Sequence, residues 1–300
     1  MKKVSAVITT HNRLELLKRA IESVKSQTYT NIELIVVCDG SEDGTKEYCE
    51  SIDDIIFIYI PKEKSKGGNY ARNIGIKHST GDYVALLDDD DYWLPTKIAH
   101  QVNGMNITGC KASYCKYNIT FCNNIHIPID DFSNKADYTL KISNETIRVE
   151  NLKYRSLYKI CVLTSSLMVS KEIIAKTGPF DEQLKAWQEF EFIVRLAQQT
   201  LFCLVDKPLF YYSINNNNKR ISDKLLDWKK SVKYIYYKHS KLYDILNFAE
   251  RTKMKHQYYL DGYIRSKKSA GRVVRSLYYI RRVFWGCLYK TQEQYGVNFR

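Results

Sequence analysis

Four consecutive aspartates, Asp88 to Asp91, are the residues of this sequence best placed to do chemistry. They follow the apolar run 83–87, which predicts a buried strand ending at the carboxylates. Their mutual repulsion is costly unless solvent or a cation relieves it. A hard divalent ion would do so, using carboxylate oxygens and the oxygens of a diphosphate as ligands. An acidic surface turn is the alternative, which the apolar run before and Trp93 behind the aspartates disfavour.

A single carboxylate, Asp39, follows a second apolar run over 35–38. It suits a helix cap, and equally an acceptor of hydrogen bonds from a ribose or a base. Gly67 and Gly68 then give a flexible loop, and Arg72 adds a cation suited to a phosphate. An arginine on a solvated helix face is the alternative for Arg72.

Two further carboxylates, Glu189 and Glu191, stand at the start of a helix predicted over 186–199. Acidic residues in a first helical turn are favoured by the helix dipole, which is sufficient reason for both. The functional alternative is that one of them is a general base for a hydroxyl nucleophile.

The elements around these residues alternate between strand and helix. Strands are expected over 4–10, 32–38, 55–60 and 83–87. Helices are expected over 14–24 with Asn12 as cap, from Ser41 or Asp43 to 50, and over 69–78. This order predicts an α/β fold with a parallel, doubly wound sheet, which binds ligands beyond the carboxyl ends of its strands. Asp39 and Asp88 both fall at such ends.

The second half of the chain is less regular. One or two strands are expected within 110–129, and further strands over 163–169, 201–205 and 209–212. A short helix is expected over 171–177, and from residue 224 onward the sequence becomes helical and basic.

In their order along the chain, these segments resemble the family-2 glycosyltransferases of GT-A fold, over about residues 3–222. The matching blocks of the nucleotide-binding half are 7–13, 26–29, 31–45, 71–75 and 81–93. Those of the second half are 165–169, 178–182 and 188–196. Any one block is weakly specific, whereas the ordered set is highly specific. The resemblance implies a Rossmann-like, mostly parallel sheet flanked by helices, with catalytic domain 1–222 divided into a nucleotide-binding half 1–105 and an acceptor-binding half 106–222. Beyond it, the residues themselves predict a basic, Tyr-rich helical region over 223–300.

The resemblance also implies inverting transfer of a sugar from a nucleotide diphosphate donor, with Mn2+ or Mg2+ as cofactor. Asp88 and Asp90 occupy the two acidic positions of the family's DxD motif, which implies Asp90 as metal ligand and Asp88 as a partner toward metal or ribose. The other implied donor contacts are Thr10, Asn12 and Asp39 to the nucleoside, Arg72 near the diphosphate, and Asp89 within the motif.

The family's catalytic base is the first aspartate of an E-D-x-D pattern, and Glu189 stands at that position. Glu191 stands at the second aspartate. Both carry one methylene more than the family's residue, so the resemblance leaves the base open between them. Many members also carry a histidine that holds the diphosphate or metal, and the nearest matching position here is Asn215.

The net charge of +13 is concentrated in the C-terminal region. Residues 219–300 contain 20 basic and 6 acidic residues, which leaves 26 basic and 27 acidic residues in 1–218. Within 265–290, arginines and lysines interleave with an apolar stripe at helical spacing, formed by Val273, Leu277, Ile280, Phe284 and Leu288. Such a helix suits an anionic membrane surface. Packing on the catalytic domain or on a second subunit in a homodimer is the equal alternative, and binding to nucleic acid is the least favoured.

These features predict a metal-dependent enzyme that moves a sugar from a UDP-sugar to a lipid-linked glycan in surface-polysaccharide assembly. No apolar run approaches the length of a membrane span, so the expected location is cytoplasmic and peripheral, on the inner face of the cell membrane. The alternatives are a nucleotidyltransferase and a catalytically degenerate glycan-binding protein.

Overall fold

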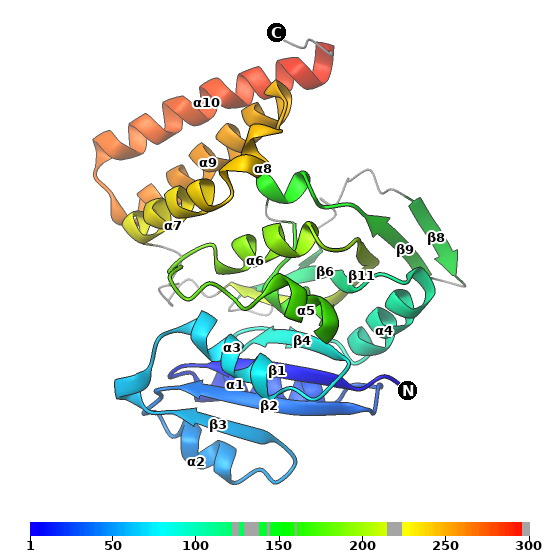
Figure 1. The fold of residues 1–300 in the computed structure, drawn as a ribbon. Coiled ribbons are helices and arrows are strands. Elements are labelled where there is room, and N and C mark those ends of the chain that lie inside the picture. The colour runs from blue at the N-terminus through cyan, green and yellow to red at the C-terminus, as the bar shows by residue number, and fades with distance from the viewer. Residues whose placement is uncertain (122–125, 129–137, 143–144, 160, 215–223, 296–300) are drawn as a thin grey trace. The chain divides into compact units, whose positions relative to one another are not determined.

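The computed structural model describes residues 1–121, 126–128, 138–142, 145–159, 161–214 and 224–295 (Figure 1). The chain forms two compact units. The first comprises residues 1–152, 162–182 and 195–217, and the second comprises 153–161, 183–194 and 218–300. Two segments that precede residue 222 therefore belong to the same unit as the C-terminal helices.

The first unit is built around a sheet whose first four strands are parallel. Their order is β3 (Ile56–Ile60), β2 (Ile32–Asp39), β1 (Val4–Thr10) and β4 (Tyr83–Asp88). Thr9 pairs with Asp88 and Thr10 with Cys38, so the carboxyl ends of three strands meet at one edge. The predicted α/β architecture is confirmed, and each of these four strands lies within a residue of its expected bounds.

Helices cover both faces of these strands because alternate side chains of β1 point to opposite sides. Ala6 and Ile8 belong to a buried core with Leu17 of helix α1 (Leu14–Lys25). On the other face, helix α3 (Gly68–His78) lies so close that a Cβ on Gly75 would stand 2.3 Å from Cγ1 of Val7. A glycine at this position therefore allows the helix to pack on the sheet.

None of the expected cap residues stands at the N-cap position of the first two helices, although Asp43 accepts a hydrogen bond from the backbone N–H of Thr45, the first residue of the second helix, at 3.3 Å. Asn12 adopts a left-handed φ of 53° and Arg13 precedes the first turn of α1, without a side-chain cap. Asp43 instead reaches across from the next loop and accepts a hydrogen bond from the backbone N–H of Leu14 at 2.9 Å. Helix α2 (Thr45–Glu50) begins after Gly44, whose φ is 84°. A residue with a left-handed backbone conformation, Asn12 or Gly44, thus lies just before each of these two helices.

Beyond β4 the sheet is mixed. It continues through β10 (Met168–Ser170), β6 (Ala112–Phe121), β11 (Phe202–Ile214), β9 (Glu145–Glu150) and β8 (Tyr138–Ile142). Two short strands, β5 (Tyr92–Trp93) and β7 (His126–Pro128), pair with β11 and β6. Helix α4 (Lys97–Thr108) packs on β6 and β11, and α5 (Lys171–Thr177) follows β10.

Two strand predictions in this half need correction. The expected strand over 163–169 is mostly a 3-10 turn, Thr164–Ser166, followed by the short β10. The two strands expected over 201–205 and 209–212 are one strand, β11, whose register with β6 shifts on either side of Pro208. Because proline has no N–H, the ladder is interrupted there without ending the strand.

The second unit is helical. It contains the start of α6 (Gln188–Ala197), then α7 (Leu225–Lys238), α8 (Ser240–Asp244), α9 (Phe248–Ser269) and α10 (Arg272–Tyr295). Helix α9 opens with a capping box between Asn247 and Glu250. Among its described residues, the second unit has one hydrophobic cluster around Phe190 and Tyr243 and another around Trp228 and Tyr278.

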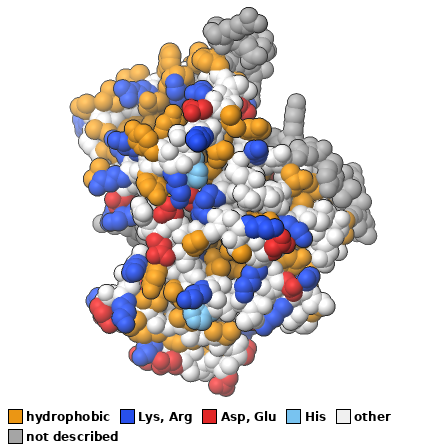
Figure 2. All heavy atoms as spheres, viewed as in Figure 1, with side chains coloured by type: hydrophobic (Ala, Val, Ile, Leu, Met, Phe, Trp, Pro, Cys, Tyr) orange, Lys and Arg blue, Asp and Glu red, His pale blue; other side chains and the backbone are white. Residues whose placement is uncertain are grey.

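Helix α10 leaves much of the predicted apolar stripe exposed. The exposed fractions are 74% for Val273, 50% for Leu277, 62% for Ile280 and 59% for Phe284. Figure 2 shows hydrophobic and basic side chains lying next to one another over the C-terminal helices. Among the described residues, no helix combines the length and apolar character needed to cross a membrane.

Candidate functional site

The four aspartates at the end of β4 alternate between exposed and buried. The side chains of Asp88 and Asp90 are 30% and 31% exposed. Asp89 and Asp91 are buried, at 4% and 2%. The two acidic residues of the DxD pattern are therefore the two whose carboxylates reach solvent, where a ligand has access.

The buried pair holds the turn in place. Asp89 accepts hydrogen bonds from the hydroxyl of Thr10 at 2.8 Å and from Arg13 at 2.9 Å. Asp91 accepts from the hydroxyl of Ser165 at 2.6 Å and from the backbone N–H of Ser213 at 2.9 Å. Burial raises the pKa of Asp89 to about 6, and burial with the neighbouring charges of Asp90 and Asp88 raises the pKa of Asp91 well above its usual range. Through these hydrogen bonds, the side chains of Asp89 and Asp91 fix the turn that carries Asp88 and Asp90.

Arginines surround the exposed pair. Arg72 of α3 is ion-paired with Asp88 at 2.6 Å. Arg13 bridges Asp89 and Asp90, and Arg19 of α1 donates to the backbone carbonyl of Asp90 at 2.7 Å. The sequence gives no sign of a role for Arg13 or Arg19, because residue spacing does not show that these side chains meet the end of β4.

The nucleoside candidates gather at the same edge of the sheet. Asp39 is 4% exposed, and its Oδ2 accepts a hydrogen bond from the backbone N–H of Gly67 at 2.8 Å. Its other oxygen, Oδ1, is buried and has no hydrogen-bond partner in the described part of the chain. An unsatisfied buried acceptor is costly, so this oxygen is ready for a donor from a ligand.

Two of the candidates are occupied by contacts within the protein. The hydroxyl of Thr10 is bonded to Asp89. Asn12 links the ends of β1 and β2: its N–H donates to the Ser41 hydroxyl at 2.9 Å, and its side-chain oxygen accepts from the N–H of Glu42 at 2.8 Å. Both residues therefore shape the loop that borders Asp39.

The two candidate bases differ sharply in environment. Glu189 is partly exposed in the first turn of α6. Glu191 is fully buried, and its Oε1 accepts from Nζ of Lys238 at 2.9 Å and from Nε2 of His239 at 3.0 Å. Both partners belong to the second unit, as Glu191 does. The environment of Glu191 is that of an internal ion pair.

The site offers a hard divalent cation two carboxylate ligands, which is fewer than such an ion requires. Asp88 and Asp90 supply carboxylate oxygens, the ligands that Mg2+ and Mn2+ prefer. No cluster of three or more His, Cys, Asp or Glu side chains arranged for a metal occurs among the residues described. The two carboxylates therefore fit a metal that takes its remaining ligands from a diphosphate and water. The candidate Asn215 lies outside the described residues.

Known proteins resemble parts of this chain. It matches the sequence profile of Glycosyl transferase family 2 over residues 5–167. The Escherichia coli protein WfaP, a UDP-Glc:alpha-D-GlcNAc-diphosphoundecaprenol beta-1,3-glucosyltransferase, is 40% identical over 119 residues. That match covers 40% of this chain and 47% of WfaP. An uncharacterized glycosyltransferase of Rickettsia typhi is 32% identical over 190 residues, covering 63% of this chain and 56% of the relative. The matches thus span about half the length of these relatives.

Solved structures share the fold at low identity. TarS of S. aureus, residues 1–349 in complex with UDP-GlcNAc, superposes with a TM-score of 0.59 at 13% identity, over 99% of this chain and 93% of TarS. The mannosyltransferase PcManGT of Pyrobaculum calidifontis, solved with GDP-Man and Mn2+, gives 0.57 at 13%, over 97% and 84%. At this identity the likeness concerns the fold, and the GT-A expectation for the sheet and its helices is confirmed. Because the family profile covers more than half of its residues, the chain belongs to glycosyl transferase family 2.

Proposed function

We propose that this protein is an inverting glycosyltransferase that moves a sugar from a UDP-sugar to a hydroxyl of a lipid-linked glycan. The observation that carries the proposal is the alternation at the end of β4, where Asp88 and Asp90 reach solvent between Arg13 and Arg72. Family membership and the sugar-nucleotide complexes of proteins with the same fold support it.

The donor would lie along the carboxyl edge of β1, β2 and β4. Oδ1 of Asp39, which is buried beside the loop that Thr10 and Asn12 shape, would accept a hydrogen bond from the base or ribose. Arg72 would meet the diphosphate, and Asp88 and Asp90 would hold the divalent cation. When bound, that cation neutralises the negative charge that grows on the departing diphosphate.

The transfer itself needs one base. We assign the role of base to Glu189, because its carboxylate is partly exposed. The carboxylate of Glu191 is buried and pairs with Lys238 and His239. Glu189 takes the proton of the acceptor hydroxyl as that oxygen bonds to the anomeric carbon of the sugar. The bond between that carbon and the diphosphate breaks in the same step. UDP leaves, and the configuration at the anomeric carbon of the sugar is inverted.

The acceptor and the location rest on the relatives and on α10. The WfaP name specifies a lipid diphosphate carrying GlcNAc as its acceptor. A lipid-linked acceptor is held at a membrane, and the exposed apolar stripe of α10 lies among arginines that suit anionic lipid. We therefore propose peripheral binding to the inner face of the cell membrane.

The proposal is tested by measuring UDP release from a panel of UDP-sugars in Mn2+, with and without a GlcNAc-diphosphate-lipid acceptor. Transfer predicts acceptor-dependent release from one donor, and its loss with EDTA. Pyrophosphate release from a nucleoside triphosphate and a sugar phosphate would instead indicate a nucleotidyltransferase. Binding of glycan without release from any donor would indicate a degenerate site.

A further inference from the structure

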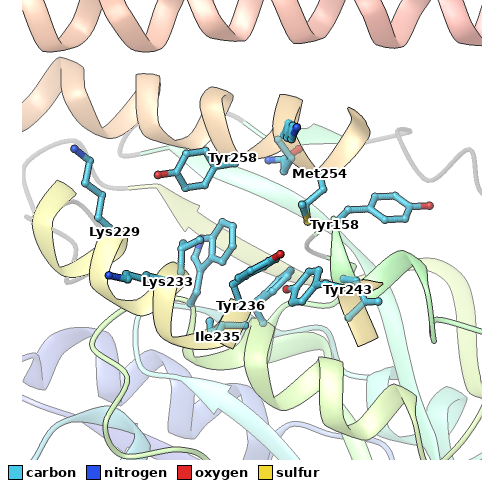
Figure 3. A pocket seen from close by; sticks show the side chains of 14 residues that line it. Tyr158, Lys229, Lys233, Ile235, Tyr236, Tyr243, Met254 and Tyr258 are labelled. Atoms are coloured by element: carbon cyan, nitrogen blue, oxygen red, sulfur yellow. The ribbon is translucent and has the colours of Figure 1, made fainter. Parts of the chain in front are cut away.

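A cavity within the second unit plays no part in the donor site. It has a volume of about 290 Å3, and all its lining residues belong to that unit. Trp187 and Phe190 form one wall at the start of α6, Tyr236 comes from α7, and Met254 and Tyr258 come from α9 (Figure 3). The body of the cavity is therefore aromatic and apolar.

Trp187 is held in this wall by an unusual backbone. Its φ is 55°, a left-handed conformation that a bulky residue adopts only when its surroundings impose it. Its ring packs on Phe190 at 4.6 Å and edge-on against Trp228 at 5.9 Å between centroids. Its indole Nε1 is buried without a hydrogen-bond partner in the described part of the chain. Trp187 thus combines a left-handed backbone with a buried, unsatisfied donor, and both are costly features of the residue that lines the cavity.

One end of the cavity is positively charged. Lys229 and Lys233 lie four residues apart on α7, so they share a helix face, and in Figure 3 both lie to the left of the aromatic side chains. A third lysine, Lys255, also lines the cavity. Within the described ranges none of the three is ion-paired with a carboxylate; Lys229 and Lys233 lie over the rings of Tyr278 and Tyr237. An apolar space with unpaired cations at one end complements an anionic amphiphile.

We propose that this cavity binds the lipid diphosphate of the acceptor, with the diphosphate at Lys229 and Lys233 and the first isoprenoid units among the aromatic rings. This inference rests on the proposed function. With a volume of about 290 Å3, the cavity has room for a segment of a prenyl chain and not for a whole one. Because Trp187 and Phe190 flank Glu189 in sequence, the bound lipid end would lie against the helical turn that carries the proposed base.

The test is calorimetric titration of the full-length protein with farnesyl diphosphate, a short prenyl diphosphate. EDTA and an Asp90→Asn background keep the probe from the donor site. We expect binding that weakens at least tenfold in Lys229→Glu/Lys233→Glu. The matched control, Lys230→Glu/Lys241→Glu, changes two exposed lysines outside the cavity lining and the net charge equally, and should stay within twofold. Farnesol and inorganic diphosphate should each bind at least tenfold more weakly than the probe.

Two results would overturn the inference: affinity for farnesyl diphosphate unchanged by Lys229→Glu/Lys233→Glu, or reduced equally by the control pair. A second variant, Val232→Trp, fills the cavity and leaves the lysines in place; unchanged binding there also counts against it. UDP binding in Mn2+ is measured in parallel on protein with Asp90 intact. Absence of UDP binding by that protein contradicts the proposed transfer, whereas loss of the cavity effects with UDP binding preserved contradicts only the lipid site.

Discussion

Glu191 of α6 and Lys238 of α7 form a buried ion pair, with 2.9 Å between Oε1 and Nζ and no exposed surface on the Glu191 side chain. His239 shares the same oxygen at 3.0 Å. The pair joins a segment from the middle of the sequence to the C-terminal helices of the second unit. The two glutamates of the expected catalytic pattern therefore lie in different environments, Glu191 in a buried ion pair and Glu189 at a partly exposed position.

Replacing each glutamate by glutamine separates these roles. Glu191→Gln leaves Lys238 and His239 without their charged partner, so we expect about 3 kcal/mol of lost stability, as for a broken buried pair. Glu189→Gln should change stability by less than about 1 kcal/mol, because the side chain is partly exposed, and should abolish transfer. Urea unfolding and UDP release measure the two effects. Full activity of Glu189→Gln would move the base to another residue.

Removal of one exposed aspartate should stop the reaction without unfolding the protein. In Asp90→Ala we expect transfer to fall at least 100-fold, because a carboxylate that meets the cation is lost at a side chain that is 31% exposed. Asp54→Ala is the matched control, since it removes an exposed carboxylate whose ion pair is with Lys25. Equal activities of the two variants would place the cation elsewhere. Thermal unfolding of both should match that of the unmodified protein within a few degrees.

Asp89 should make stability depend on pH. Its pKa is about 6 in the folded protein against 3.8 for an ordinary aspartate, so between these values the folded state holds a proton that the unfolded state releases. This term lowers the free energy of unfolding as pH rises from about 4 to 6, by up to about 3 kcal/mol, and is constant above. In Asp89→Asn the term is absent. Urea unfolding in EDTA across pH 4–8 should show the variant gaining stability relative to the unmodified protein over that window; parallel profiles would contradict the shift.

The exposed stripe of α10 should control membrane binding. Ile280→Glu/Phe284→Glu places two charges where the side chains are 62% and 59% exposed, and we expect at least a tenfold loss of affinity for anionic liposomes. Ile107→Glu/Leu201→Glu changes two exposed apolar residues of the first unit and should bind as the unmodified protein does. Cosedimentation measures both. If the α10 variant sediments normally, the stripe covers something other than lipid.

The sequence predicts well whatever depends on local pattern. The strands that end at Asp39 and Asp88 are found where apolar, β-branched runs place them, and the acidic DxD positions prove to be the exposed ones. What it misses depends on contacts between distant segments. Neither the bond from Asp43 to the start of α1 nor the pairing of Glu191 with Lys238 has a signature in residue spacing. The sequence predicts two strands on either side of Pro208, whereas in the structure Pro208 interrupts the hydrogen-bond ladder within the single strand β11.

The path of the chain restricts how this protein can be rearranged. The chain passes from one unit to the other five times, after residues 152, 161, 182, 194 and 217. No single cut yields both units whole, and a chain ending after residue 217 would keep Glu191 but lose Lys238 and His239. The helical unit is therefore not a detachable module that fusion at one junction could add or exchange. Any recombined relative that keeps it must inherit residues 153–161 and 183–194 together with the C-terminal helices.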